Sequence, residues 1–285
     1  MKSESVPTSP PGEPLTSPCL PKRIVCLTAE SVDILYALGA GDLVVGISGY
    51  TVTPDEARRK PKVGAYTSVD FEKIFSLEPD LVIAYSDLQA DITATLARRG
   101  ATILHLNQRS LVGMFEAIAL IGAVVGRMPA ATALVDRLRA ECESMRTAAM
   151  SLPRRPRVYF EEWDDPLITG IRWVSEAVTL AGGEDVFADL GTRGVAAERI
   201  VSSAEVIRRD PEMVFASWCG KKVRPDRIAA RPGWDGITAV REGRIYEIKS
   251  AHILQPGPVI MRGMRQLATT IAAWANGAPS TPQSV

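Results

Sequence analysis

From residue 22 onward, short apolar runs alternate with segments of helical periodicity. Residues 23–27 are typical of a buried strand, and residues 31–38 have the spacing of a helix that ends at Gly39. The pattern predicts further strands at residues 44–47, 81–85 and 102–106 and further helices at residues 69–77 and 87–99. This alternation favours an α/β fold with mainly parallel sheets covered on both faces.

The stretch from residue 111 to 150 differs, because its helical periodicity continues with few breakers. Its second part, residues 130–150, predicts one helix of about 30 Å at 1.5 Å per residue. The prolines of residues 153–156 end this helix, and an alternating pattern resumes at residue 157. We therefore expect a rigid connecting helix between two α/β units.

Two segments of the second half repeat segments of the first half in the same order. Residues 72–85 and 205–218 each read as a helix, a proline turn and an apolar strand. Residues 99–106 have a counterpart at 242–248. The repeats predict two related lobes with a cleft between them. We place a disordered tail at 1–21, an N-terminal lobe at 22–125, the connecting helix at 126–153 and a C-terminal lobe at 154–285.

Composition and charge narrow the choice of partners. The chain has 33 basic and 33 acidic residues, so no field of one sign is available to hold nucleic acid. No apolar run reaches the length of a membrane span, and the first 21 residues contain no apolar run of signal-peptide length. We expect a monomer that does not insert into a membrane and that stays in the cytoplasm if the start of the sequence is correct.

An acidic and aromatic stretch follows the strand that begins at residue 157. It contains Trp163, Arg172 and Trp173, and we expect it to form a loop at a strand end, where open sheets bind ligands. Its acidic residues at 161, 162, 164 and 165 leave an enzyme open as an alternative, since paired carboxylates can divide acid and base roles. That signal is weak, because the chain lacks a phosphate-binding glycine loop, a nucleophile elbow and metal-ligand spacing.

Several runs carry a resemblance to a known family. They are residues 23–39, 45–50, 63–66, 181–187, 205–218 and 231–246. In this order they resemble the helix-backbone class (class III) of periplasmic binding proteins of ABC importers, closest to the cobalamin-binding members, and the likeness covers residues 22–274. The resemblance implies a non-enzymatic protein that closes two lobes on a corrinoid, with haem or a ferric siderophore as the alternative ligand and no resident cofactor or metal. It also implies a periplasmic location, which conflicts with the absence of a visible signal peptide.

The resemblance also implies ligand-binding residues. Tyr50, Tyr66 and Tyr85 align with aromatic contacts of cobalamin-binding members, and a flat macrocycle needs such rings. In the second lobe, Trp163 and Trp173 are the predicted ring contacts, and Arg172 is a predicted polar contact. Each of these aromatic residues could instead pack in the core.

The segment of residues 250–258 departs from the family. Cobalamin carriers have acidic and basic contacts here, whereas this chain has Ala251 and Gln255. We keep Gln255 as a predicted ligand contact. His252 on the same segment could ligate a cobalt or haem iron, or could be an ordinary solvated histidine.

Two glutamates match positions at which importing relatives face the permease. Glu72 and Glu205 would each present one carboxylate per lobe to arginines of an ABC permease, which would guide docking. The alternative is that each simply occupies a first helical turn, where the helix dipole favours an acid.

Overall fold

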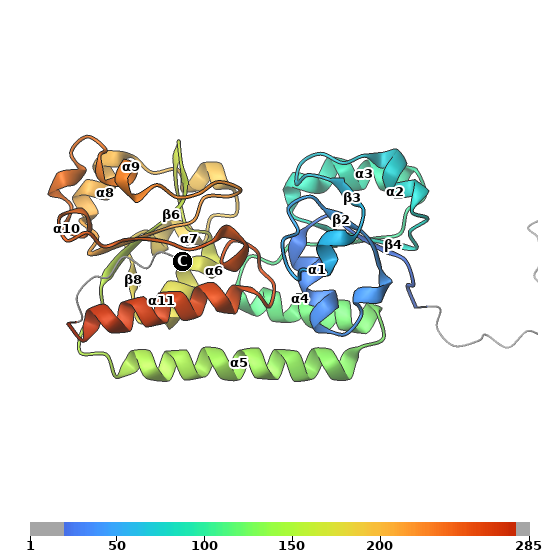
Figure 1. Cartoon of the computed structure of the whole chain (residues 1–285), viewed down its shortest axis with the longest axis horizontal. Helices are drawn as coiled ribbons and strands as arrows, with labels where there is room; N and C mark the ends of the chain where they lie inside the picture. The colour runs from blue at the N-terminus through green and yellow to red at the C-terminus, as the bar shows by residue number, and fades with distance from the viewer. Residues whose placement is uncertain (1–19, 278–285) are drawn as a thin grey trace, which may run out of the picture.

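The computed structural model describes residues 20–277, which form two α/β lobes joined by the long helix α5 (Met128–Met150). Figure 1 shows the lobes side by side above α5, which runs beneath both of them. The predicted fold class is therefore confirmed: two lobes, mainly parallel sheets, covering helices and a connecting helix. Most of the predicted tail, residues 1–19, lies outside the described residues.

The first lobe is built on a five-stranded parallel sheet in the order β3-β2-β1-β4-β5. The central strands β1 and β4 are buried at every position, because helices cover both faces, and both are apolar throughout. The strands are β1 (Ile24–Cys26), β2 (Val44–Ser48), β3 (Lys62–Gly64), β4 (Leu81–Tyr85) and β5 (Ile103–Leu106). The helices are α1 (Ala29–Ala37), α2 (Phe71–Ser76), α3 (Ala90–Arg98) and α4 (Leu111–Val124).

The second lobe has a mixed sheet in the order β10-β9-β6-β7, with β8 also paired to β6. Only β7 among these runs antiparallel to its neighbour. The strands are β6 (Arg157–Asp164), β7 (Leu167–Thr169), β8 (Glu184–Asp185), β9 (Met213–Ala216) and β10 (Ile245–Glu247). The helices are α6 (Arg172–Leu180), α7 (Ala188–Gly191), α8 (Ser203–Arg209), α9 (Pro225–Ala229), α10 (Thr238–Arg241) and α11 (Ile260–Ala275).

The structure corrects the prediction of a loop at the acidic stretch. Strand β6 continues through Asp164, and residues 167–169 return as β7, so that Glu161 and Glu162 lie within a strand. The acidic run was predicted to be a loop because burying an unpaired carboxylate is unfavourable. Here arginines from distant segments pair with both glutamates, and the sequence pattern could not show this. Strand β3 was also missed, since its sequence, Lys-Val-Gly, contains only one apolar side chain and forms no apolar run.

Helix α5 begins with a proline in its first turn, where the missing N–H costs nothing. Its 23 residues span about 34 Å at 1.5 Å each. Its buried side chains join the largest apolar cluster of the described chain, which contains Ile24 of β1, Phe115 of α4, Leu138 of α5 and Ile271 of α11. The lobes therefore share one core along the helices, which restricts their relative motion.

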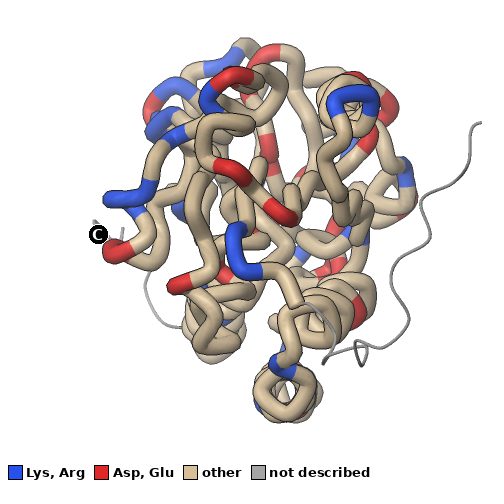
Figure 2. Tube along the Cα trace, turned by 90° about the vertical axis from the view of Figure 1, so that its right-hand side faces the viewer, with Lys and Arg blue, Asp and Glu red and all other residues tan. Residues whose placement is uncertain are grey.

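Charges of both signs are interspersed along the chain when it is viewed from the end of the first lobe (Figure 2). This agrees with the equal numbers of acidic and basic residues. Within residues 20–277, none of the helices combines the length and the apolar character that crossing a bilayer requires.

Candidate functional site

The predicted tyrosines lie at one edge of the first sheet. Tyr50 follows β2, Tyr66 follows β3, and Tyr85 is the last residue of β4. Because these strands are parallel, their carboxyl ends meet at the same edge. The Tyr66 hydroxyl is 3.0 Å from Oγ of Ser86, the residue that follows β4, so the ends of β3 and β4 are tied together by side chains.

The three tyrosines differ in exposure. Tyr50 is 48% exposed, Tyr66 is half-buried and Tyr85 is buried. The Tyr85 hydroxyl donates to the carbonyl of Gln108 at 2.8 Å, and burial raises the pKa of both Tyr66 and Tyr85. Both phenols are thus neutral donors or acceptors, with Tyr50 the most accessible ring.

Sequence reasoning missed Glu30, which lies in the first turn of α1, shortly after β1. Its carboxylate is buried and accepts a 2.5 Å hydrogen bond from the Thr28 hydroxyl. Burial raises the pKa of Glu30 to about 7, and it lies within electrostatic range of Tyr66 and Tyr85. An acid in a first helical turn is common, so only its position directly after a buried strand could have drawn attention to it.

In the second lobe the acidic residues of β6 are already paired. Glu161 binds Arg231 through two hydrogen bonds and also accepts from Nε1 of Trp218 at 3.0 Å. Glu162 binds Arg199 at 2.7 and 3.1 Å. These arginines hold both carboxylates in place. The two groups that the enzyme alternative would use for acid and base catalysis therefore have a structural role.

Trp163 lies beside a cation at the end of β6. Its half-buried indole lies 4.2 Å from Nζ of Lys221, which is also paired with Asp164. Its Nε1 donates to the carbonyl of Asp165 at 2.9 Å, so one edge of the ring is fixed.

The other two predicted contacts of this stretch have different environments. Trp173 is buried in the core, and its Nε1 donates to the carbonyl of Ile253 at 3.0 Å. Arg172 is exposed and binds Glu176 at 2.9 Å along helix α6. Burial leaves little of the Trp173 ring for a ligand in this conformation, and ligand roles for both residues stay predictions.

The two lobes meet where these strand ends lie. A β-carbon placed on Gly220 would lie 3.7 Å from Cε1 of Tyr50, and Arg109 donates to the carbonyl of Gly194 at 3.2 Å. We name this region the interlobe face and define it by these residues together with Tyr66, Tyr85, Trp163 and Lys221. Rings from both lobes therefore border one junction.

Nearer the helices, two further bonds join the lobes. The backbone N–H of Val259 donates to Asp33 of α1 at 2.7 Å, and the N–H of Leu111 donates to Glu176 of α6 at 2.8 Å. Burial raises the pKa of Asp33 to about 6. These contacts hold the lobes together on the side of the connecting helix.

His252 and Gln255 lie on the segment that leads into α11. Both are half-buried, and the carbonyl of His252 packs against Gly263 of α11. Burial lowers the pKa of His252, with Arg262 and Lys249 acting in the same direction, so the imidazole is neutral at pH 7. Among residues 20–277, no group of three or more metal-ligating side chains is gathered that could hold an ion.

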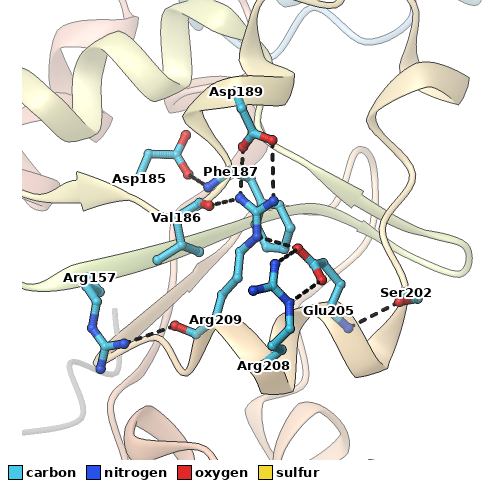
Figure 3. Close-up of polar contacts among 9 residues, drawn as sticks. All are labelled: Arg157, Asp185, Val186, Phe187, Asp189, Ser202, Glu205, Arg208 and Arg209. Carbon is cyan, nitrogen blue, oxygen red and sulfur yellow. Dashed lines mark hydrogen bonds and ion pairs between the residues drawn. The ribbon is translucent and has the colours of Figure 1, made fainter.

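The two predicted docking glutamates are not equivalent. The Glu72 side chain is 86% exposed and contacts Arg99 at 2.9 Å. Glu205 accepts from Arg208 at 2.6 and 2.8 Å and from Arg209 at 2.7 Å, and these bonds lower its pKa to about 2. Figure 3 shows Glu205 enclosed by the two arginines, with Arg209 reaching on to Asp189.

Two hollows of the described chain lie away from the predicted ligand residues. One of about 360 Å³ lies between the lobes beside α5 and α11, and Asp33, Pro54, Arg137 and Arg262 are among its lining residues. The other, of about 410 Å³, lies between α4, α5 and α6. Neither is lined by the predicted tyrosines or tryptophans.

Residues 24–252 match the family described as periplasmic binding protein. The chain belongs to the periplasmic binding protein family. The predicted resemblance is thus confirmed. An uncharacterized ABC transporter substrate-binding lipoprotein of Bacillus subtilis is 27% identical over 266 residues, which cover 88% of this chain and 80% of that protein. A cobalamin-binding protein of Halobacterium salinarum is 27% identical over 260 residues, which cover 87% of this chain and 69% of that protein.

Solved structures of this family share the fold. A periplasmic heme-binding protein from Roseiflexus superimposes with a TM-score of 0.78 at 24% identity, covering 89% of this chain and 99% of that one. The periplasmic vitamin B12-binding protein of Vibrio cholerae superimposes with a TM-score of 0.73 at 24% identity, covering 90% and 98%. These two solved structures, named for heme binding and for vitamin B12 binding, thus share the fold of this chain.

Proposed function

We propose that this chain binds a corrinoid between its two lobes. The observation that carries the proposal is the placement of aromatic rings from both lobes at the interlobe face, namely Tyr50 and Tyr66 from lobe one and Trp163 from lobe two. A macrocycle is large, flat and partly apolar, so rings on opposite walls suit it. Relatives named for cobalamin and vitamin B12 binding support the same ligand class.

The charge pattern favours a corrinoid over haem or a ferric siderophore. Haem propionates and many siderophores need cations, and four cations of this region are already paired with carboxylates of the chain. The pairs are Arg109 with Asp87, Lys221 with Asp164, Arg199 with Glu162 and Arg231 with Glu161. The side chains at the rim of cobalamin are mostly uncharged amides, which need no free cation.

The test is a titration of purified protein with dicyanocobinamide, cyanocobalamin and haemin, followed by absorbance and calorimetry. We expect tight binding of a corrinoid and weaker binding of haemin. Haemin binding with an axial-ligand spectrum that His252→Ala abolishes would instead favour the haem alternative, because the neutral imidazole of His252 is able to ligate iron. No binding of any of the three would overturn the proposal.

We further propose that the chain releases the corrinoid unchanged to an ABC permease, as a non-catalytic carrier outside the cytoplasm. The pairing of Glu161 and Glu162 with arginines supports carriage rather than turnover. Recovery of chemically intact ligand by mass spectrometry tests the first part. The mature N-terminus of the cellular protein tests the compartment, since relatives are periplasmic or lipoproteins.

Of the two predicted docking residues, Glu72 is the better placed. Its carboxylate is largely exposed, whereas Glu205 is held by Arg208 and Arg209. We expect Glu72→Gln to weaken salt-sensitive association with a vitamin B12 permease reconstituted in nanodiscs. Glu78→Gln, which alters another exposed acid of the same lobe, is the control and should associate normally.

A further inference from the structure

Gln108 is buried, and the part of the chain that the structure describes offers its side chain no hydrogen-bond partner. The residue is 7% exposed, and neither its amide nitrogen nor its amide oxygen has a hydrogen-bond partner within residues 20–277. A carboxamide has two donor hydrogens and an acceptor oxygen, and burying all of them unpaired is unfavourable. A buried polar group of this kind normally has a hydrogen-bond partner, and the described residues do not supply one.

A second glutamine of the same lobe shows that this chain satisfies buried amides elsewhere. Gln89 is fully buried, accepts from the backbone N–H of Tyr85 at 3.0 Å and donates to the carbonyl of Tyr66 at 2.8 Å. Its amide therefore links the end of β4 to the segment that follows β3. Gln108 has the same side chain and similar burial, but its amide makes no such hydrogen bonds to other segments within residues 20–277.

Gln108 belongs to the segment that reaches the second lobe. It follows β5 at the carboxyl edge of the sheet, and its backbone carbonyl accepts a hydrogen bond from the Tyr85 hydroxyl. The next residue, Arg109, donates to the carbonyl of Gly194 in lobe two. The unpartnered amide is thus one residue from a direct contact between the lobes.

Resting on the proposed function, we propose that the carboxamide of Gln108 recognises a carboxamide of the ligand. Its N–H donates to the ligand carbonyl, and its oxygen accepts from the ligand N–H, so two hydrogen bonds form between like groups. A carboxylate at the same place would set its oxygen against the oxygen of Gln108 and lose one bond. Gln108 therefore selects amide-bearing corrinoids over corrinoid acids.

The test measures affinity and stability together on full-length protein. We expect Gln108→Leu to lower the affinity for dicyanocobinamide at least about tenfold, the scale of one good hydrogen bond. The thermal midpoint of the ligand-free protein should stay unchanged or rise, because an unpaired buried amide is removed. Gln89→Leu is the matched control, and there the midpoint should fall.

A second variant tests selectivity and replaces the first if Gln108→Leu does not fold. Gln108→Glu keeps the size and removes the donor. The probes are dicyanocobinamide and its mono-carboxylic acid obtained by hydrolysis of one amide. The wild type should prefer the amide. The variant should bind dicyanocobinamide more weakly, because it loses the donor to the ligand carbonyl, and should bind the mono-acid more weakly still, because two carboxylates repel each other.

The outcomes separate this assignment from the proposed function. Wild-type protein that binds no corrinoid overturns both. If the wild type binds dicyanocobinamide and both Gln108 variants bind it as tightly as the wild type does, only the Gln108 assignment is overturned. A lower midpoint with unchanged affinity in Gln108→Leu also overturns it, since that pattern belongs to a structural residue.

Discussion

The fully buried carboxylate of Glu161 is held by the guanidinium of Arg231 through hydrogen bonds of 2.5 and 2.9 Å. Arg231 lies 70 residues further along the chain, so the pair joins β6 to the segment after α9. Removing one partner leaves a buried charge uncompensated. We expect Arg231→Ala to lower the free energy of unfolding by about 3–5 kcal/mol, measured by urea denaturation.

The control for this pair is Arg224→Ala, which removes an arginine bonded to Asp226 at the surface. Exposed ion pairs are screened by water and salt, so no measurable loss is expected. Equal losses in the two variants would contradict a special role for the Glu161–Arg231 pair.

The Trp163 ring is expected to contact the corrinoid directly. Trp163→Ala should weaken binding of dicyanocobinamide about tenfold or more, because a truncated aromatic contact at an interface commonly costs that much. Titration by absorbance measures the effect. Trp274→Ala is the matched control, since this tryptophan packs beneath Arg154 at the end of α11 and should affect stability but not affinity. An unchanged affinity in Trp163→Ala would remove that residue from the site.

Glu30 should make stability depend on pH near neutrality. Its pKa is raised by burial from 4.5 to about 7, so the folded state binds its proton more tightly than the unfolded state does. The resulting stabilisation is complete below pH 4.5 and is lost as the pH rises through 7, with a slope of at most about 1.4 kcal/mol per pH unit. Urea midpoints between pH 5 and 8 should fall less steeply in Glu30→Gln. Asp91→Asn on α3 should leave the wild-type slope in place.

Glu205 should make stability depend on pH in the opposite direction, at acid pH. The hydrogen bonds from Arg208 and Arg209 lower its pKa from 4.5 to about 2, so its stabilisation is present above pH 4.5 and is lost as the pH falls towards 2. Thermal midpoints measured across this range should decline less in Glu205→Gln than in the wild type. Identical acid profiles would show that the arginine contacts in Figure 3 contribute nothing to stability.

The alternation of strands and helices could be predicted because each element has a recognisable local sequence pattern. Strand β4 is apolar at all five positions and is followed by a polar segment, and helix α5 runs 23 residues without an internal breaker. Capping residues also mark helix starts: Asp70 accepts from the N–H of Lys73, and Ser110 accepts from the N–H of Gly113. Periodicity and caps depend on neighbours in sequence, so they can be read without a structure.

The environment of each candidate site residue depended on segments far away in sequence. The half-buried state of Trp163 and the burial of Trp173 could not be predicted, since both are tryptophans near one strand. The arginines that allow Glu161 and Glu162 into β6 come from residues 231 and 199.

The amino-acid sequence by itself determined the α/β alternation, the two related halves and the family, because these depend on local periodicity and on the order of short motifs. Only the tertiary structure decided which charges are paired, which rings stay accessible and that the side chain of Gln108 has no hydrogen-bond partner within residues 20–277. Burial and pairing are properties of side chains brought together across long chain separations, and no local pattern encodes them.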